Sequence, residues 1–143
     1  MCDYCDCRSQ AEIAALSADH ERLLSMTAAL RRSLADGVPI ERRELGELAD
    51  LLLPHAAREE IGVFAALRDV GVETDYVDRY EDNHRRIDDL LAGAARLPSA
   101  AGPLIELVEE HILREETDLF PAARQLLAPD RWDAVDQRVL QAS

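Results

Sequence analysis

The stretch that decides the fold is His55-Ala-Ala-Arg-Glu59-Glu60, which returns 56 residues later as His111-Ile-Leu-Arg-Glu115-Glu116. Each stretch places a glutamate four residues after a histidine, so on an α-helix the two side chains share one face. The only other histidines, His20 and His84, each fall in the helical segment that precedes one of these stretches. This order predicts imidazole and carboxylate groups on four helices, which is how a helical bundle builds a dinuclear metal centre.

Four segments carry apolar residues at helical spacing. Three- and four-residue steps predict helices over residues 12–35, 41–69, 74–96 and 103–127. The connections between them are short, so consecutive helices are expected to be antiparallel. We therefore predict an all-α fold, an up-down-up-down antiparallel four-helix bundle.

A short capping helix is expected at the C-terminus. Pro129-Asp130 offers a cap at its start. Its apolar residues would pack across the end of the bundle; they are Trp132, Val135 and Val139.

Length and charge limit the classes of protein to consider. The 143 residues suit one domain, which we expect over residues 11–143 after a tail of residues 1–10. The formal net charge of −13 repels phosphate backbones and anionic lipids, so no nucleic-acid or membrane partner is expected. The acidic start of the chain does not resemble a signal peptide, and a soluble, cytoplasmic protein is expected.

Three cysteines, Cys2, Cys5 and Cys7, lie in the first seven residues. One interpretation is a frayed tail with reduced thiols. The other is a second metal or redox site that passes electrons or binds a partner protein, because Cys-x-x-Cys is a known ligand spacing. The identity of such a partner does not follow from the sequence.

The histidines and two glutamates replace apolar residues within the apolar stripes. A buried carboxylate costs several kcal/mol unless it is paired or bound to a metal, so a cation is expected among these side chains. Histidine with carboxylate suits iron, manganese or zinc, and a nonhaem diiron centre fits best, with zinc as the rival. The predicted ligands are His20, His55, Glu59, His84, His111 and Glu115.

With these residues, the chain from about Leu16 to Leu127 resembles a hemerythrin-like (HHE cation-binding) domain. The resemblance implies two iron ions joined by an oxo or hydroxo bridge. It implies that His20 and His55 bind one iron and that His84 and His111 bind the other, with Glu59 and Glu115 bridging them.

The sequence departs from this family in one ligand. Oxygen-carrying members have a histidine four residues before the position of His84, and this chain has Tyr80. Tyr80, or Tyr76 one turn earlier, is either an iron ligand or core filling. The family's second bridging carboxylate also sits five residues after its histidine in some members, so Glu116 competes with Glu115, which the stripe favours.

A tyrosine ligand would change the expected reaction. Phenolate stabilises Fe(III), which disfavours oxygen carriage, and the resemblance to short bacterial members implies reaction with hydrogen peroxide or nitric oxide. The alternative is a protein that stores or senses oxygen or iron without turnover. Glu60 and Glu116 are either proton relays or solvated residues of the helix face, and the second interpretation is favoured.

Overall fold

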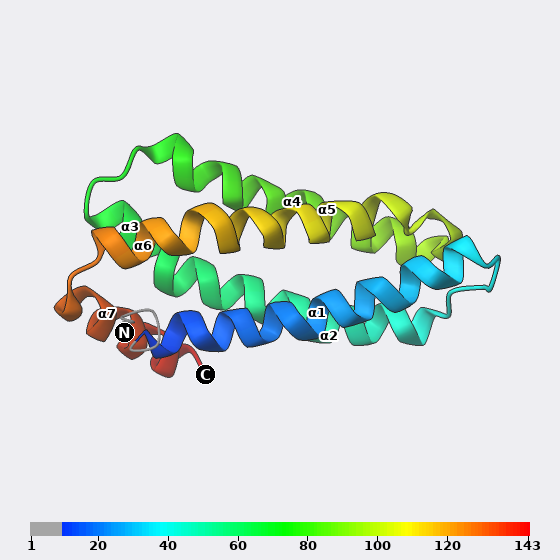
Figure 1. Ribbon diagram of the computed structural model, residues 1–143, viewed down its shortest axis with the longest axis horizontal. Coiled ribbons are helices and arrows are strands. Elements are labelled where there is room, and N and C mark those ends of the chain that lie inside the picture. Colours follow the sequence, from blue (N-terminus) through cyan, green and yellow to red (C-terminus); the bar gives the residue numbers. More distant parts are fainter. Residues whose placement is uncertain (1–9) are drawn as a thin grey trace.

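The computed structural model describes residues 10–143, and every regular element in that range is helical (Figure 1). The all-α prediction is therefore confirmed. The predictions for Cys2, Cys5 and Cys7 lie outside the described residues. The elements are α1 (Ala11–Ala35), α2 (Arg42–Glu59), η2 (Glu60–Phe64), α3 (Ala65–Asp69), α4 (Thr74–Arg96), η3 (Pro98–Ala100), α5 (Gly102–Arg114), η4 (Glu115–Leu119), α6 (Phe120–Leu126) and α7 (Pro129–Ala142).

Four long helical segments lie side by side along the molecule, and the chain reverses direction at each short connection (Figure 1). The segments are α1, α2–η2–α3, α4 and α5–η4–α6. Within them α1 contacts α2 and α5, while α4 contacts the same two helices. Gly37 and Gly71 lie at two of the reversals with φ of 69° and 87°, a left-handed backbone that glycine adopts without a Cβ clash.

The predicted second and fourth helices each contain a π-helical turn that the sequence analysis did not anticipate. These turns, η2 and η4, begin directly after Glu59 and Arg114. A π turn contains one more residue than an α turn and therefore changes which residues face inward. In these segments Phe64 lies against His84 and Phe120 lies against His20.

The last helix, α7, lies beside one end of the long segments (Figure 1), where it contacts η2 and α3, and its last residues line a pocket together with Pro54 and Ala57 of α2. Trp132 and Val135 are buried there, and Val139 packs against the same cluster. The predicted cap at Pro129-Asp130 is wrong, because Ala128 is the N-cap and Pro129 already occupies the first turn. Proline is well suited to that turn, where its missing N–H has no intrahelical acceptor.

Two apolar clusters make up the core. One contains Leu23, Leu48 and Leu104, and the other contains Leu16, Phe64 and Phe120 near α7. The four histidines lie between these clusters along the helices, buried as the apolar stripes predicted. No helix in residues 10–143 is both long enough and apolar enough to cross a membrane.

Candidate metal centre

Six polar side chains meet in the interior, between the two apolar clusters. Each is at most 5% exposed, and both carboxylates are fully buried. They come from four different helical segments; they are His20 from α1, His55 and Glu59 from α2, His84 from α4, His111 from α5 and Glu115 from η4. These are the six residues that the stripes predicted as ligands.

Glu59 directs one oxygen to each side of the cluster. Its Oε2 lies 3.1 Å from Nε2 of His55, and its Oε1 lies 3.1 Å from Nε2 of His84. His55 and His84 belong to different helix pairs, so this carboxylate spans the two halves of the cluster.

Glu115 repeats the arrangement with the other two histidines. Its Oε1 lies 3.0 Å from Nε2 of His20, and its Oε2 lies 3.0 Å from Nε2 of His111. Both glutamates therefore face both halves, as bridging carboxylates must.

The histidine nitrogens themselves gather in two pairs. Nε2 of His20 and His55 are 3.1 Å apart, and Nε2 of His84 and His111 are also 3.1 Å apart. With the two carboxylates, each pair forms a group whose ligand atoms all lie within 4.8 Å of one another. The pairing is the one that the family resemblance implied.

Each histidine also has a partner on its outer nitrogen, Nδ1. Glu116 lies 2.5 Å from His20 Nδ1, and Glu60 lies 2.6 Å from His84 Nδ1. The sequence favoured a solvated face for these two glutamates. Their carboxylates are 36% and 41% exposed, yet each one contacts a buried imidazole.

Asp19 and Asn83 are the outer partners of the other two histidines. Asp19 Oδ2 lies 3.0 Å from His55 Nδ1, and Asn83 Nδ2 lies 3.3 Å from His111 Nδ1. The sequence analysis missed both residues. A signal was present, because each directly precedes a histidine, His20 or His84, although it contacts a different one.

The outer partners have a chemical consequence. A carboxylate that accepts a hydrogen bond from Nδ1–H fixes the tautomer in which Nε2 carries a free lone pair. In three of the four histidines that lone pair then points toward the interior cluster, in the form that a metal ion requires.

The two π turns bring phenylalanine rings against the histidines. Phe120 stacks on His20 with ring centroids 5.5 Å apart and an interplanar angle of 6°. Phe64 stacks on His84 at 5.4 Å and 16°. These contacts hold the imidazole planes on the side facing the second apolar cluster.

Charge in the metal-free cluster is shared between imidazole and carboxylate. Burial disfavours the imidazolium, but the close contact with the negative charge of Glu59 outweighs it and raises the pKa of both His55 and His84 to about 9. Burial would also raise the pKa of Glu59, but its close contacts with these two histidines hold that pKa well below the ordinary value.

Two carboxylate oxygens lack a hydrogen bond despite full burial. They are Oε2 of Glu59 and Oε2 of Glu115, and neither has a partner with hydrogen-bond geometry among the described residues. The nearby Nε2 atoms of His55 and His111 are close enough but poorly directed. Unpaired buried anionic oxygens that converge with imidazole nitrogens fit a bound cation, which would satisfy them.

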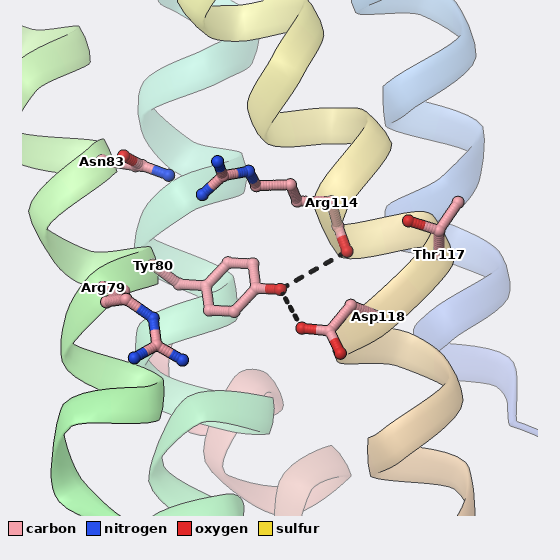
Figure 2. Close-up of a pocket in the computed structure, with 6 residues that line it drawn as sticks. All are labelled: Arg79, Tyr80, Asn83, Arg114, Thr117 and Asp118. Carbon is pink, nitrogen blue, oxygen red and sulfur yellow. Dashed lines mark hydrogen bonds between the residues drawn. The ribbon is translucent and has the colours of Figure 1, made fainter.

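Tyr80 lies beside the cluster with its hydroxyl directed elsewhere. The hydroxyl donates to Asp118 Oδ2 at 2.5 Å, and Figure 2 shows it between Asp118 and the backbone carbonyl of Arg114. Burial and the bond to Asp118 raise the pKa of Tyr80 above its ordinary value, which favours the phenol over the phenolate. Iron ligation by Tyr80 stays a prediction that requires this hydroxyl to leave Asp118.

Tyr76 donates to the same oxygen of Asp118, at 2.8 Å. Its ring meets that of Tyr80 edge-on, with centroids 5.7 Å apart. The ring of Tyr80 in turn lies edge-on to His111 at 6.0 Å.

No curated protein and no solved structure matches the chain. The family model described as the hemerythrin HHE cation binding domain matches residues 10–123, which include all six clustered residues and their outer partners. The chain belongs to the hemerythrin HHE cation-binding domain family.

Proposed function

We propose that this protein is an antiparallel four-helix bundle of the hemerythrin type, that it holds two iron ions, and that it reacts with hydrogen peroxide or nitric oxide. The observation that carries the proposal is the placement of the two glutamates. Glu59 and Glu115 each direct one oxygen to the pair His20–His55 and the other to the pair His84–His111. Two ions, one beside each pair, use all eight donor atoms.

Donor spacing supports iron over zinc. Adjacent ligands of an octahedral ion with bonds of about 2.1 Å are about 3.0 Å apart, whereas those of a tetrahedral ion are about 3.4 Å apart. Both Nε2–Nε2 separations and four Nε2–carboxylate separations are 3.0–3.1 Å, and Nε2 of His20 lies 3.8 Å from Oε2 of Glu59. An octahedral ion with two nitrogens and two carboxylate oxygens from the protein keeps positions for a small ligand.

The burial of the site supports a small reactant. Because the six side chains are at most 5% exposed, a bulky molecule does not reach them, and we expect a reactant as small as peroxide, nitric oxide or dioxygen. Bound iron would supply the Lewis-acid and redox chemistry. The protein's own residues fix the imidazole orientation through Asp19, Glu60 and Glu116, and they surround the reactant with apolar side chains.

The test is metal content together with peroxide consumption, measured on protein produced with excess iron. We expect about two irons per chain and consumption of peroxide or nitric oxide. The same protein loaded with zinc is the matched control, because zinc occupies the ligands without redox chemistry. Reversible dioxygen binding with no consumption would replace this proposal with oxygen storage or sensing, and a chain that takes up only zinc would overturn it.

A further inference from the structure

Two tyrosines in this protein share one proton acceptor. Tyr80 and Tyr76, one turn apart on α4, both donate to Oδ2 of Asp118 on η4, at 2.5 and 2.8 Å. Figure 2 shows Asp118 beside the Tyr80 hydroxyl at the edge of a surface pocket of about 240 Å³. Asp118 is exposed, so its carboxyl group can exchange a proton with water.

The same tyrosines connect the metal centre to the surface. Tyr80 is 6% exposed, and its ring lies 6.0 Å from His111 between centroids. The ring centroid of Tyr76 lies 5.7 Å from that of Tyr80, and Tyr76 is partly exposed. The Arg79 guanidinium carbon is 5.7 Å from the centroid of the Tyr76 ring, which places a positive charge at the outer end.

Packing does not account for this pair. The corresponding positions in the other half, 64 residues earlier, are Leu16 and Glu12. Leu16 is fully buried and fills the core without any hydroxyl. The counterpart of Asp118, 56 residues earlier, is Gly62. The fold therefore builds one half without a phenol or an acceptor, and the other half has both.

Chemistry gives the arrangement a role. A phenol that loses one electron becomes strongly acidic and must lose its proton in the same event. A carboxylate already hydrogen-bonded to the hydroxyl accepts that proton without any movement of the chain. When two phenols share one acceptor, an electron can move from the second phenol to the first. The acceptor then returns a proton to the first phenol and takes the proton of the second.

We propose that Tyr80 and Tyr76, with Asp118 as their shared proton acceptor, form a one-electron relay from a small anionic reductant at the surface to the metal centre. The proposal rests on the proposed function, because hydrogen peroxide is the oxidant that withdraws electrons from the centre. Arg79 is the cation that attracts the anionic donor, for which ascorbate is the probe.

Tyr80 gives one electron to the oxidised centre, its O–H bond breaks, and the proton passes to Asp118. Tyr76 then gives an electron to Tyr80, which recovers a proton from Asp118 while the proton of Tyr76 replaces it. Ascorbate reduces Tyr76, Asp118 returns the proton, and the proton lost by ascorbate enters water. Reduction of hydrogen peroxide to two waters takes up two protons from water, equal to the two that ascorbate releases, so two rounds convert one hydrogen peroxide and two ascorbate anions into two waters and two ascorbyl radical anions.

The experiment uses the iron-loaded full chain, mixed with hydrogen peroxide without a reductant, frozen within milliseconds and examined by electron paramagnetic resonance. Ring-deuterated tyrosine identifies the radical. We expect a tyrosyl radical in the wild type and in Tyr4→Phe, which alters the one tyrosine outside the proposed pair. The radical should be lost in Tyr80→Phe and in Asp118→Asn. Tyr76→Phe should keep the radical and slow its reduction by ascorbate.

Peroxide consumption and metal content are measured on the same samples. Consumption by the wild type without a tyrosyl radical would overturn the relay and leave the proposed function intact. A radical that persists in Tyr80→Phe would do the same, as would a visible band of the resting protein that disappears in Tyr80→Phe, since that band would identify a phenolate ligand. Absence of consumption in iron-loaded protein would overturn the proposed function and the relay with it. Mass spectrometry after repeated peroxide additions gives a second readout, as oxidation at Tyr76 and Tyr80.

Discussion

The two halves of this molecule, α1 with α2 and α4 with α5, build matching donors in different surroundings. Histidines and glutamates at corresponding positions present the same atoms to the cluster. Outside it, Gly62 lies under α7, where an added Cβ would approach Val135 and Val139 to 3.1 Å. Its counterpart, Asp118, is exposed beside a pocket. The two proposed ions would need similar ligands but not equal access from solvent, and this chain covers one half and leaves the other open.

The largest expected effect is the loss of bound metal when a bridging carboxylate is removed. Glu59→Ala should lose most of the bound metal, because both proposed ions would share that residue, and Glu115→Ala should lose a similar fraction if the two halves are equivalent at the cluster. Metal per chain, measured by mass spectrometry, checks this, with exposed Glu47→Ala on α2 as the control. Full retention of metal in Glu59→Ala would refute its bridging role, and unequal losses would show that the symmetry of the donors is only geometric.

The next effect concerns metal removal and pH. His55 and His84, one in each half, have pKa values raised to about 9 in the metal-free cluster. Their imidazolium forms therefore stabilise the metal-free fold fully below pH 6.5, and this contribution is lost as pH rises through about 9. Metal binding displaces these protons, so metal affinity should rise over the same range.

Thermal unfolding of metal-free and metal-loaded protein on both sides of that range measures the effect. Metal at about 1,000 times its Kd adds about 4 kcal/mol to the free energy of unfolding. The loaded protein should be the more stable one, and its advantage should grow with pH. A metal-free protein whose stability does not fall between pH 6.5 and 9 would contradict the imidazolium assignment.

A smaller effect comes from the outer partners. Asp19 holds His55 with a carboxylate, whereas Asn83 offers His111 an amide. Loss of such a partner typically lowers metal affinity about 10- to 100-fold. Asp19→Asn should therefore lower metal affinity by about 10-fold, the smaller value of that range. Asn83→Asp should raise metal affinity. Competition with a chelator measures both changes. Exposed Asp89→Asn on α4 is the control, and equal affinities in all variants would show that the outer partners do not tune the metal.

The sequence predicted the interior of the site better than its surroundings. His20, His55 and the other donors interrupt apolar stripes, so their burial followed from helical periodicity alone. Outer partners such as Glu60 lie on partly exposed helix faces, where periodicity does not distinguish a solvated carboxylate from one that binds a histidine. The π turns change the register after Glu59 and Arg114, and single-residue patterns do not specify them. The contact between Tyr80 and Asp118 joins distant segments and depends on that register.

The smallest expected effect is on the free energy of unfolding, when one of two hydrogen-bonded groups on the outer faces of the two halves is altered. On the covered half, Arg58 binds buried Glu12 through two hydrogen bonds of 2.6 Å. On the open half, the counterpart of Glu12 is Tyr76, which donates one bond to exposed Asp118. Hydrogen bonds to charged groups contribute about 1.5–3 kcal/mol, less when water screens them. Because the Arg58 side chain is 36% exposed, Glu12→Gln should cost about 1–2 kcal/mol.

Tyr76→Phe should cost less than about 1 kcal/mol, because its partner is exposed and water replaces the lost bond. Urea unfolding of the two variants in metal-free protein measures both costs without interference from the ions. A larger loss in Tyr76→Phe than in Glu12→Gln would mean that the open half, and not the half under α7, is the more rigidly built. In that case the hydrogen bonds that Tyr76 and Tyr80 donate to Asp118 would mainly stabilise the fold. The asymmetry of the two halves would then serve stability rather than access to the metal centre.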